Sequence, residues 1–183
     1  MTVEDAASEG LGARPSAREL NWSSVYSDQL PRLYNFFRYR IGRDADVEDL
    51  TAQTFEKAWK ARARYRRDLA GFSTWLFSIA RNVATDYLRS SRTHAPLEAA
   101  RDVAVEGTPE SEVAHRSDIA RLAQLTQHLS DRQRELIALK YGAALNNRII
   151  AGITGLSESN VGTTLQRTVE KLRAQWEQRE PRR

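Results

Sequence analysis

The side chains of this sequence that can do chemistry are recognition groups, and they lie in two adjacent stretches. In the first stretch, acidic and amide residues recur at three- and four-residue steps: Asp46, Asp49, Gln53 and Glu56. This spacing places them on one face of a helix. Because a solvated helix usually carries charges of both signs, a face with carboxylates and an amide alone predicts a basic protein partner.

The sign of the charge reverses in the second stretch. From Lys57 to Arg92, nine Lys and Arg occur with two Asp, a net charge of +7, and aromatic residues are interspersed among them. Cationic side chains bind phosphates, and aromatic rings stack with unpaired bases. The stretch therefore predicts a nucleic-acid surface. A pair of bundle helices with ordinary charged faces is the plainer alternative.

Candidate catalytic and metal-ligating groups are sparse. The sequence has no cysteine, which excludes disulfides, thiolate zinc sites and cysteine nucleophiles. The histidines His94, His115 and His128 are scattered, and the sequence shows neither a nucleophile–base pair nor a phosphate-binding loop. We therefore expect no enzyme, no catalytic residue, no metal and no cofactor.

Composition places the chain among soluble globular proteins. Its 183 residues suffice for one domain or two small ones, and a hydrophobic fraction of 40% predicts a folded core. No apolar run approaches the roughly 20 residues of a membrane span, and no signal peptide is visible at the N-terminus. We expect no membrane span and a cytoplasmic location.

Helical periodicity recurs in at least five segments and strand-like alternation is absent, which predicts an all-α fold. The first helix should begin after a cap at Ser23 or Ser24 and end near Ile41. Pro31 lies within this run, so we expect a break or kink near Leu30.

Two further helices flank a basic loop over residues 64–71. Asp44 is a suitable N-cap for the second helix, which should end near residue 63, and Ser73 is one for the third, which should end near residue 91. On the third helix, the spacing places Trp75 in the core and turns Asn82 outward. The amide of Asn82 can both donate to and accept from a base edge.

A change of pattern near residue 93 divides the chain. Between residues 93 and 119 the periodicity stops, and two Arg occur with six acidic residues, a net charge of −4. Such a segment is typical of a linker. The predicted organisation is a disordered N-terminal tail at 1–22, a first helical domain at 23–92, a flexible linker at 93–111, a second helical domain at 112–176 and a C-terminal tail at 177–183.

The second domain contains a helix-turn-helix pattern. A helix over 147–153 precedes the Gly-containing turn 154–156 and a further helix, which Ser157 can cap. Earlier in this domain, Ser130 or Asp131 can cap another helix. The N-terminal turn of the helix after Ser157 can face a phosphate.

Two runs of this sequence, DVEDLTAQTF at 46–55 and FSTWLFSIARN at 72–82, resemble conserved region 2 of the extracytoplasmic-function (group IV) sigma factors of the sigma-70 family. The helix-turn-helix resembles region 4 of the same family, in the family's order. The resemblance implies a sigma-2-like bundle joined by a flexible linker to a sigma-4-like domain. It also implies a promoter-specificity subunit that recognises −10 and −35 elements and helps melt DNA for transcription initiation.

The resemblance implies roles for individual residues. The polymerase-binding residues are those of the acidic face: Asp46, Asp49, Gln53 and Glu56. The residues implied for the −10 element lie in the basic loop and on the following helix: Arg64, Tyr65, Arg66, Arg67, Asp68, Phe72, Ser78, Arg81, Asn82, Thr85 and Arg89. Those implied for the −35 element are Ser157, Ser159, Asn160, Thr163, Thr164 and Arg167. The implied partners are bacterial core RNA polymerase, promoter DNA and an anti-sigma factor.

The second domain departs from the family's pattern. Family members often carry Lys or Arg near the positions of Gly162 and Thr164, and here Arg167 alone is basic on that outer face. Gly162 also costs a helix interior about 1 kcal/mol relative to Ala. Arg148 and Ile150 make the preceding helix atypical too. Because fewer cations release fewer counterions, we expect weak −35 binding by the free protein.

Two alternatives remain open from the sequence. A stand-alone helix-turn-helix regulator would bind duplex DNA tightly without polymerase, and the sparse charge around Arg167 speaks against it. A protein adaptor that borrows the fold fits if the DNA faces are covered. Association with core polymerase and initiation at a defined site distinguish a sigma factor from both.

Overall fold

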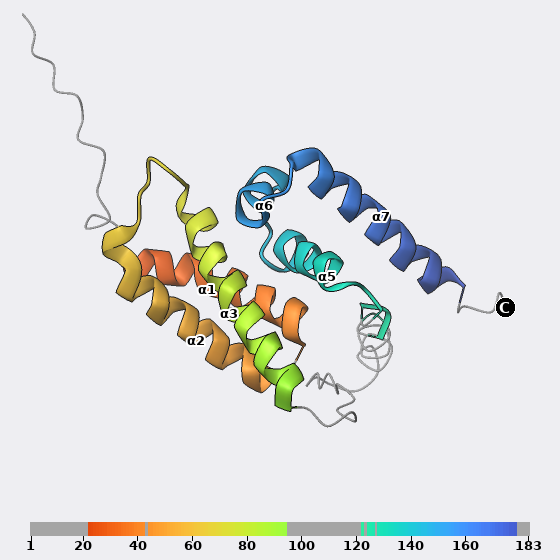
Figure 1. Ribbon diagram of the computed structural model, residues 1–183, viewed down its shortest axis with the longest axis horizontal. Coiled ribbons are helices and arrows are strands. Elements are labelled where there is room, and N and C mark those ends of the chain that lie inside the picture. The colour runs from red at the N-terminus through yellow and green to blue at the C-terminus, as the bar shows by residue number, and fades with distance from the viewer. Residues whose placement is uncertain (1–21, 43, 95–121, 123, 127, 179–183) are drawn as a thin grey trace, which may run out of the picture.

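The computed structural model describes residues 22–42, 44–94, 122, 124–126 and 128–178, and every regular element in these ranges is helical (Figure 1). The first module contains α1 (Trp22–Ile41), α2 (Asp44–Ala61), the 3-10 helix η2 (Arg62–Arg64) and α3 (Phe72–His94). The second contains α5 (Asp131–Ile137), the π-helical turn η3 (Ala138–Gly142), α6 (Asn147–Thr154) and α7 (Glu158–Glu177). The predicted all-α class is confirmed.

Several predictions fall on parts of the chain that lie outside the described residues. These are the N-terminal tail, most of the linker and the start of the second helical domain. The last residues of the C-terminal tail lie outside them as well. The domain boundaries proposed from the sequence therefore stay predictions.

Three helices build the first module around a shared apolar core. Phe37 of α1, Val47 of α2 and Phe77 of α3 are fully buried where the helices meet. Thr54 lies on the same apolar face of α2 and is also fully buried. Its hydroxyl donates to the carbonyl oxygen of Leu50 at 2.8 Å, so the buried polar group is satisfied within its own helix.

The predicted caps of the first and third helices are wrong. α1 begins at Trp22, so Ser23 and Ser24 lie inside the helix, and α3 begins at Phe72, so Ser73 does too. The ring centroids of Trp22 and Phe72 lie 6.1 Å apart in an edge-to-face contact. Such a contact stabilises both rings beyond their burial, and it is made by the residues that open the two helices.

The predicted break at Pro31 is also wrong. α1 is continuous from Trp22 to Ile41 with Pro31 inside it. Proline removes one backbone hydrogen bond from a helix. Pro31 is exposed. The carbonyl group that loses its partner therefore lies on the solvent-exposed face of the helix, where water can donate a hydrogen bond to it.

The predicted caps of the second module are confirmed. The hydroxyl of Ser130 accepts from the backbone N–H of Gln133 at 3.2 Å, and the Gln133 side chain accepts from the Ser130 N–H at 3.0 Å. Ser157 accepts from the N–H of Asn160 at 3.2 Å at the start of α7. Between them, Gly155 closes α6 in the left-handed conformation, with φ of 73°, which glycine adopts without a Cβ clash.

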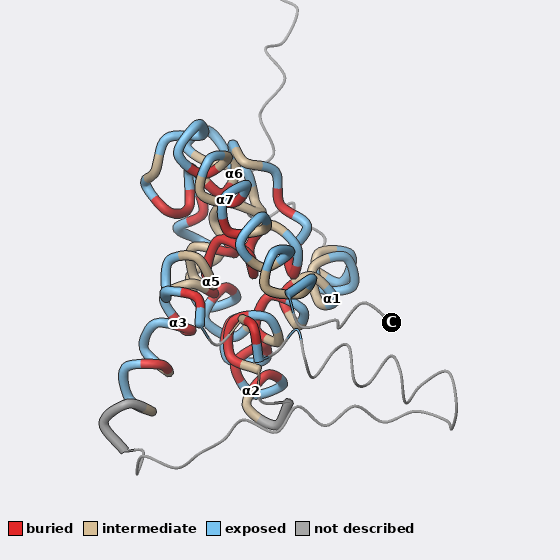
Figure 2. Tube along the Cα trace, turned by 90° about the vertical axis from the view of Figure 1, so that its right-hand side faces the viewer, coloured by how far each residue is buried: buried red, intermediate tan, exposed pale blue. Residues whose placement is uncertain are grey.

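The two modules lie against each other. α1 packs on η3 and α5, and α3 packs on α6 (Figure 1). Buried residues of both modules belong to one hydrophobic cluster, which includes Phe77, Leu136 and Ile150. Figure 2 shows the buried residues gathered on the inner sides of the helices, with exposed residues outside. The candidate site residues on α3 therefore lie close to the second module.

Candidate functional site

The acidic face of α2 is available at the surface. Asp49, Gln53 and Glu56 are exposed, and Asp46 is half-buried. Glu56 pairs with Lys60 one turn later, and the hydrogen bond and charge of that ammonium lower the pKa of the Glu56 carboxyl. Asp46 accepts a hydrogen bond from the Tyr87 hydroxyl of α3 at 2.6 Å. The structure thus gathers the four side chains of the predicted polymerase-binding face, with Asp46 tied to the next helix.

The basic loop, residues 64–71, begins at the last residue of η2, and its cations lie at the surface. Arg64, Arg66 and Arg67 are exposed. Arg66 forms two hydrogen bonds with Asp68, at 3.0 and 2.8 Å, and this contact raises the pKa of the Arg66 guanidinium. A paired fork of this kind fixes the geometry of both side chains. Asp68 therefore holds the Arg66 guanidinium, while the side chains of Arg64 and Arg67 are exposed.

An aromatic cluster packs against the inner side of the loop. Tyr65 retains 7% of its exposure, and its ring centroid lies 5.6 Å from that of Phe72 and 5.0 Å from that of Trp75. Burial raises the pKa of the Tyr65 hydroxyl. Trp75, predicted to be core, is half-buried within this cluster. In this arrangement Tyr65 anchors the loop from inside, and its predicted contact with DNA stays a prediction.

A stacked pair at the end of α2 was missed by the sequence reasoning. The side chain of Trp59, near the end of α2, is 48% exposed. The guanidinium carbon of Arg62 lies 3.9 Å from the Trp59 ring centroid, and Arg62 donates to the Trp59 carbonyl oxygen at 2.7 Å. A Trp followed three residues later by Arg at a helix end is the signal that could have indicated this cation–π pair.

The predicted DNA face of α3 contains both exposed residues and half-buried residues that bind other groups of the protein. Asn82, Thr85 and Arg89 are exposed. Ser78 is half-buried and donates to the carbonyl oxygen of Thr74 at 2.7 Å. Arg81 is half-buried and binds Glu135 of the second module, with 2.7 Å between its Nε and the carboxylate oxygen. Because Glu135 lies 54 residues away in the sequence, no local pattern indicates this pairing.

The predicted −35 residues lie together at the start of α7. Thr164 is half-buried, and the exposed residues are Ser157, Ser159, Asn160 and Thr163. Thr164 donates to the Asn160 side chain at 3.1 Å, which leaves the Asn160 amide nitrogen as a donor. Arg167, two turns into the helix, is exposed. A Cβ added to Gly162 would lie 3.4 Å from the Asn147 amide, so this glycine faces α6.

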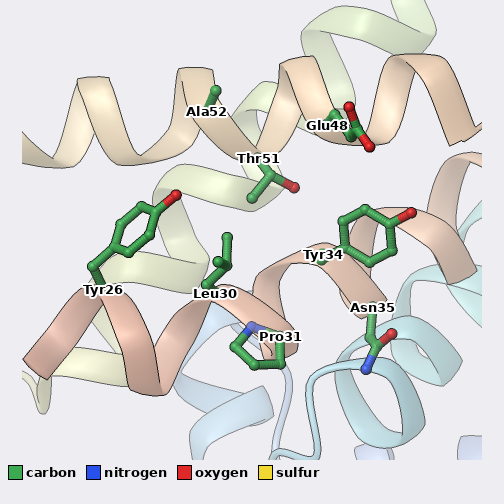
Figure 3. Close-up of a pocket in the computed structure, with 8 residues that line it drawn as sticks. All are labelled: Tyr26, Leu30, Pro31, Tyr34, Asn35, Glu48, Thr51 and Ala52. Carbon is green, nitrogen blue, oxygen red and sulfur yellow. The ribbon is translucent and has the colours of Figure 1, made fainter.

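A shallow apolar groove lies between α1 and α2, on the same module as the acidic face. It has a volume of about 480 Å³ and contains one charged side chain, that of Glu48 (Figure 3). Its lining is Tyr26, Leu30, Pro31, Tyr34, Asn35, Glu48, Thr51 and Ala52. Among the described helices, none is long and apolar enough to cross a membrane.

Comparison with known proteins assigns both modules to one family. Residues 25–94 match sigma-70 region 2, and residues 119–172 match sigma-70 region 4. The sigma factor CnrH of Cupriavidus metallidurans is 33% identical over 72% of this chain and 73% of its own length. The ECF sigma factor BldN of Streptomyces coelicolor is 28% identical over 81% of this chain. The chain spans 57% of the length of BldN and 36% of a sigma factor relative of Xanthomonas campestris.

Solved structures show the same fold. CnrH in complex with the cytosolic domain of CnrY aligns with a TM-score of 0.63 and 24% identity, covering 90% of this chain and 94% of CnrH. The sigma factor RpoE of Bartonella quintana, in complex with the anti-sigma factor NepR, aligns with a TM-score of 0.70 and 21% identity, covering 87% and 99%. With both family regions present in order, the chain belongs to the sigma-70 family of RNA polymerase sigma factors, in its extracytoplasmic-function group.

Proposed function

We propose that this chain is a promoter-specificity subunit, which binds core RNA polymerase through α2 and promoter DNA through the basic loop, α3 and α7. The observation that carries the proposal is the pair of opposite surfaces on one module. Asp49, Gln53 and Glu56 lie exposed on α2, and Arg64 and Arg67 lie exposed immediately after it. The first surface suits a basic protein partner, and the second suits a phosphate backbone.

The proposed contribution to DNA melting depends on binding of a separated DNA strand by the loop and α3. Exposed guanidiniums of Arg64 and Arg67 can hold the backbone of a separated strand, and the amide of Asn82 can read a base edge. The stacking that bases lose when the duplex opens can be regained in part on protein groups. The exposed Trp59 ring, backed by Arg62, is a candidate for such a contact.

The second module contributes through α7. A helix-turn-helix places the N-terminal residues of its second helix against base edges in the major groove. Here these residues are Ser159, Asn160 and Thr163, all exposed and all capable of hydrogen bonding. With few cations beside them, we infer that α7 refines promoter choice after polymerase has concentrated the chain at DNA.

The partners and location proposed here follow the family. RpoE of Bartonella quintana was solved with an anti-sigma factor, and we infer that an anti-sigma factor also binds this chain. The subunit performs no chemical step of its own and works in the cytoplasm, where polymerase and DNA are. A stand-alone regulator is not favoured, because the relatives are sigma factors over both modules.

In vitro transcription tests the proposal. Core polymerase with this chain should initiate at a defined subset of a promoter library, and core polymerase alone should not. The substitution Asp49→Lys should weaken capture by core about tenfold or more, because like charges then face each other. Asp28→Lys on exposed α1 is the matched control for charge. Initiation at no defined site, or tight duplex binding that never needs polymerase, would reject the proposal.

A further inference from the structure

Two helices of the second module begin with a serine cap but use their third residue differently. In α5, the amide oxygen of Gln133 accepts from the Ser130 N–H at 3.0 Å and is engaged within the cap. In α7, Asn160 occupies the same position after Ser157, and its amide oxygen accepts from the Thr164 hydroxyl at 3.1 Å. Asn160 is therefore oriented by a side chain one turn further along its own helix.

The hydrogen bond of Thr164 differs from those of other helical threonines in this protein. A threonine hydroxyl in a helix commonly donates to the backbone carbonyl of the residue four positions earlier. Thr154 and Thr168 do so, at 2.8 and 2.7 Å. Thr164 donates to the side chain of that residue instead. Because a hydroxyl has a single proton to donate, its bond to Asn160 replaces the usual bond to the backbone.

This bond determines which group Asn160 offers to a ligand. An amide side chain carries its oxygen on one branch and its nitrogen on the other. With the oxygen bound to Thr164, the nitrogen lies on the branch away from that residue. Asn160 is exposed, and its amide nitrogen makes no hydrogen bond within the described part of the chain. Asn160 therefore offers a donor, while its acceptor is turned toward its own helix.

An unrestrained asparagine and an oriented one recognise different bases. In the major groove, an unrestrained asparagine binds adenine through two bonds, because it donates to N7 and accepts from N6 at the same time. Guanine offers two acceptors, N7 and O6, thymine offers the acceptor O4, and cytosine offers only the donor N4. A donor whose companion oxygen is already bound therefore fits guanine and thymine, loses the second bond to adenine and has no partner on cytosine.

We propose that Thr164 is a positioning residue that fixes Asn160 as a hydrogen-bond donor, so that α7 selects guanine or thymine over adenine and cytosine at one position of the −35 element. The proposal rests on the proposed function for the binding of α7 to promoter duplex. It gives Thr164 a role other than the DNA contact that the family resemblance implies, since the hydroxyl acts through Asn160. Thr164 is half-buried and Asn160 is exposed, which suits this division of roles.

Base preferences measured with substituted chains test the proposal. Core polymerase with each chain transcribes a library in which the −35 element is randomised, and barcodes in the transcripts report the preferred base at each position. Asn160→Ala identifies the position, because the preference for guanine or thymine should collapse there. At that position Thr164→Val, which keeps the side-chain shape without the hydroxyl, should raise adenine relative to guanine at least about threefold. Thr164→Ser keeps the hydroxyl and should retain the parent preference.

Two further substitutions supply a reversal and a matched control. Asn160→Asp replaces the donor with an acceptor and should favour cytosine, whose N4 group donates. Thr163→Val removes the hydroxyl of the neighbouring exposed threonine and should leave the ratio of adenine to guanine at the Asn160 position unchanged. An unchanged ratio in Thr164→Val, an equal shift in Thr164→Ser, or no position altered by Asn160→Ala would each overturn the proposal.

A measurement without DNA separates this proposal from the proposed function. Nitrogen-15 relaxation of the Asn160 side-chain amide should report an ordered group in the parent chain and in Thr164→Ser, and a mobile group in Thr164→Val. Equal mobility in the parent chain and in Thr164→Val would overturn the role of Thr164 even where transcription is observed. If the parent chain directs no initiation, the proposed function fails. The relaxation data and the bases of duplexes selected by the free protein then decide the role of Thr164.

Discussion

The two candidate DNA surfaces differ in how they are charged. Residues 62–92 carry seven Arg and two Asp, a net charge of +5. α7 carries three basic and three acidic residues, a net charge of zero. Because cations supply most of the affinity for a phosphate backbone, the proposed function assigns the holding of DNA to the first module and the reading of bases to the second. Affinity for the backbone and discrimination between bases are then properties of separate regions of one protein.

The two surfaces also differ in how they are positioned. The loop after η2 rests on the rings of Tyr65, Phe72 and Trp75, so tertiary packing sets its shape. The start of α7 is set by a cap at Ser157 and by the buried Val161 one turn later. Substitutions should therefore disturb the first surface through its core and the second through its backbone.

The largest expected effect is the loss of a ring beneath the loop. Tyr65→Ala should lower the free energy of unfolding by about 3 kcal/mol, since large-to-small changes at buried aromatic residues leave a cavity. Tyr65→Phe keeps the ring and should stay within about 1 kcal/mol of the parent chain. Urea titrations measure both. If Tyr65→Phe retains stability but loses single-stranded DNA binding, the hydroxyl contacts DNA and the supporting role assigned to Tyr65 is incomplete.

Removal of two loop cations should have the next largest effect. Arg64→Ala with Arg67→Ala should weaken single-stranded DNA binding by about tenfold at low salt and reduce the salt slope by about 1.4, since each neutralised phosphate contributes about 0.7. Fluorescence titrations over a range of NaCl concentrations measure the slope. Folding should be unchanged, because both side chains are exposed. An unchanged slope would remove the loop from the DNA surface.

Loss of the N-cap of α7 should have a smaller effect, and that effect should be on stability alone. Ser157→Ala should cost about 1 kcal/mol of stability, because the N–H of Asn160 loses its acceptor. Ser157→Asp should retain the cap and is the matched control. Thermal and urea unfolding measure both variants. A full loss of −35 recognition in Ser157→Asp, with stability intact, would show that the hydroxyl itself contacts DNA.

The smallest expected effect concerns the one predicted cation of the −35 surface. Arg167→Ala should reduce duplex binding by less than about threefold and the salt slope by about 0.9, the value of one phosphate contact. Electrophoretic or fluorescence titration with a promoter duplex measures it. A loss as large as that of the loop variant would show that the second module also supplies affinity for the DNA backbone.

Local features of this molecule could be predicted from its sequence. Ser157, and Ser130 as one of two candidates beside Asp131, were predicted as caps because a cap is defined by residues three positions away. The acidic face of α2 and the exposed Asn82 followed from helical spacing in the same way. In each case the determining partners lie within one turn of the chain.

Features that depend on distant partners could not be predicted. α1 and α3 begin at Trp22 and Phe72, whose rings are in contact although the two residues are far apart in the sequence. The engagement of Arg81 depends on Glu135. The π-helical turn ends at Gly142, and its lack of a side chain allows a close contact with the α1 backbone. Spacing shows which residues share a face, but it does not show what covers that face.

The hydrogen bond from Tyr87 to Asp46 has a consequence for genetics. The phenol belongs to α3 and the carboxylate to the acidic face of α2, and 2.6 Å separates their oxygens. A mutant screen that recovers changes at Asp46 should therefore collect pleiotropic alleles. Each such change also removes the hydrogen bond that Asp46 accepts from Tyr87 of the neighbouring helix. Alleles at Asp49, which is exposed, should separate the phenotypes and be suppressible by compensating changes in the polymerase alone.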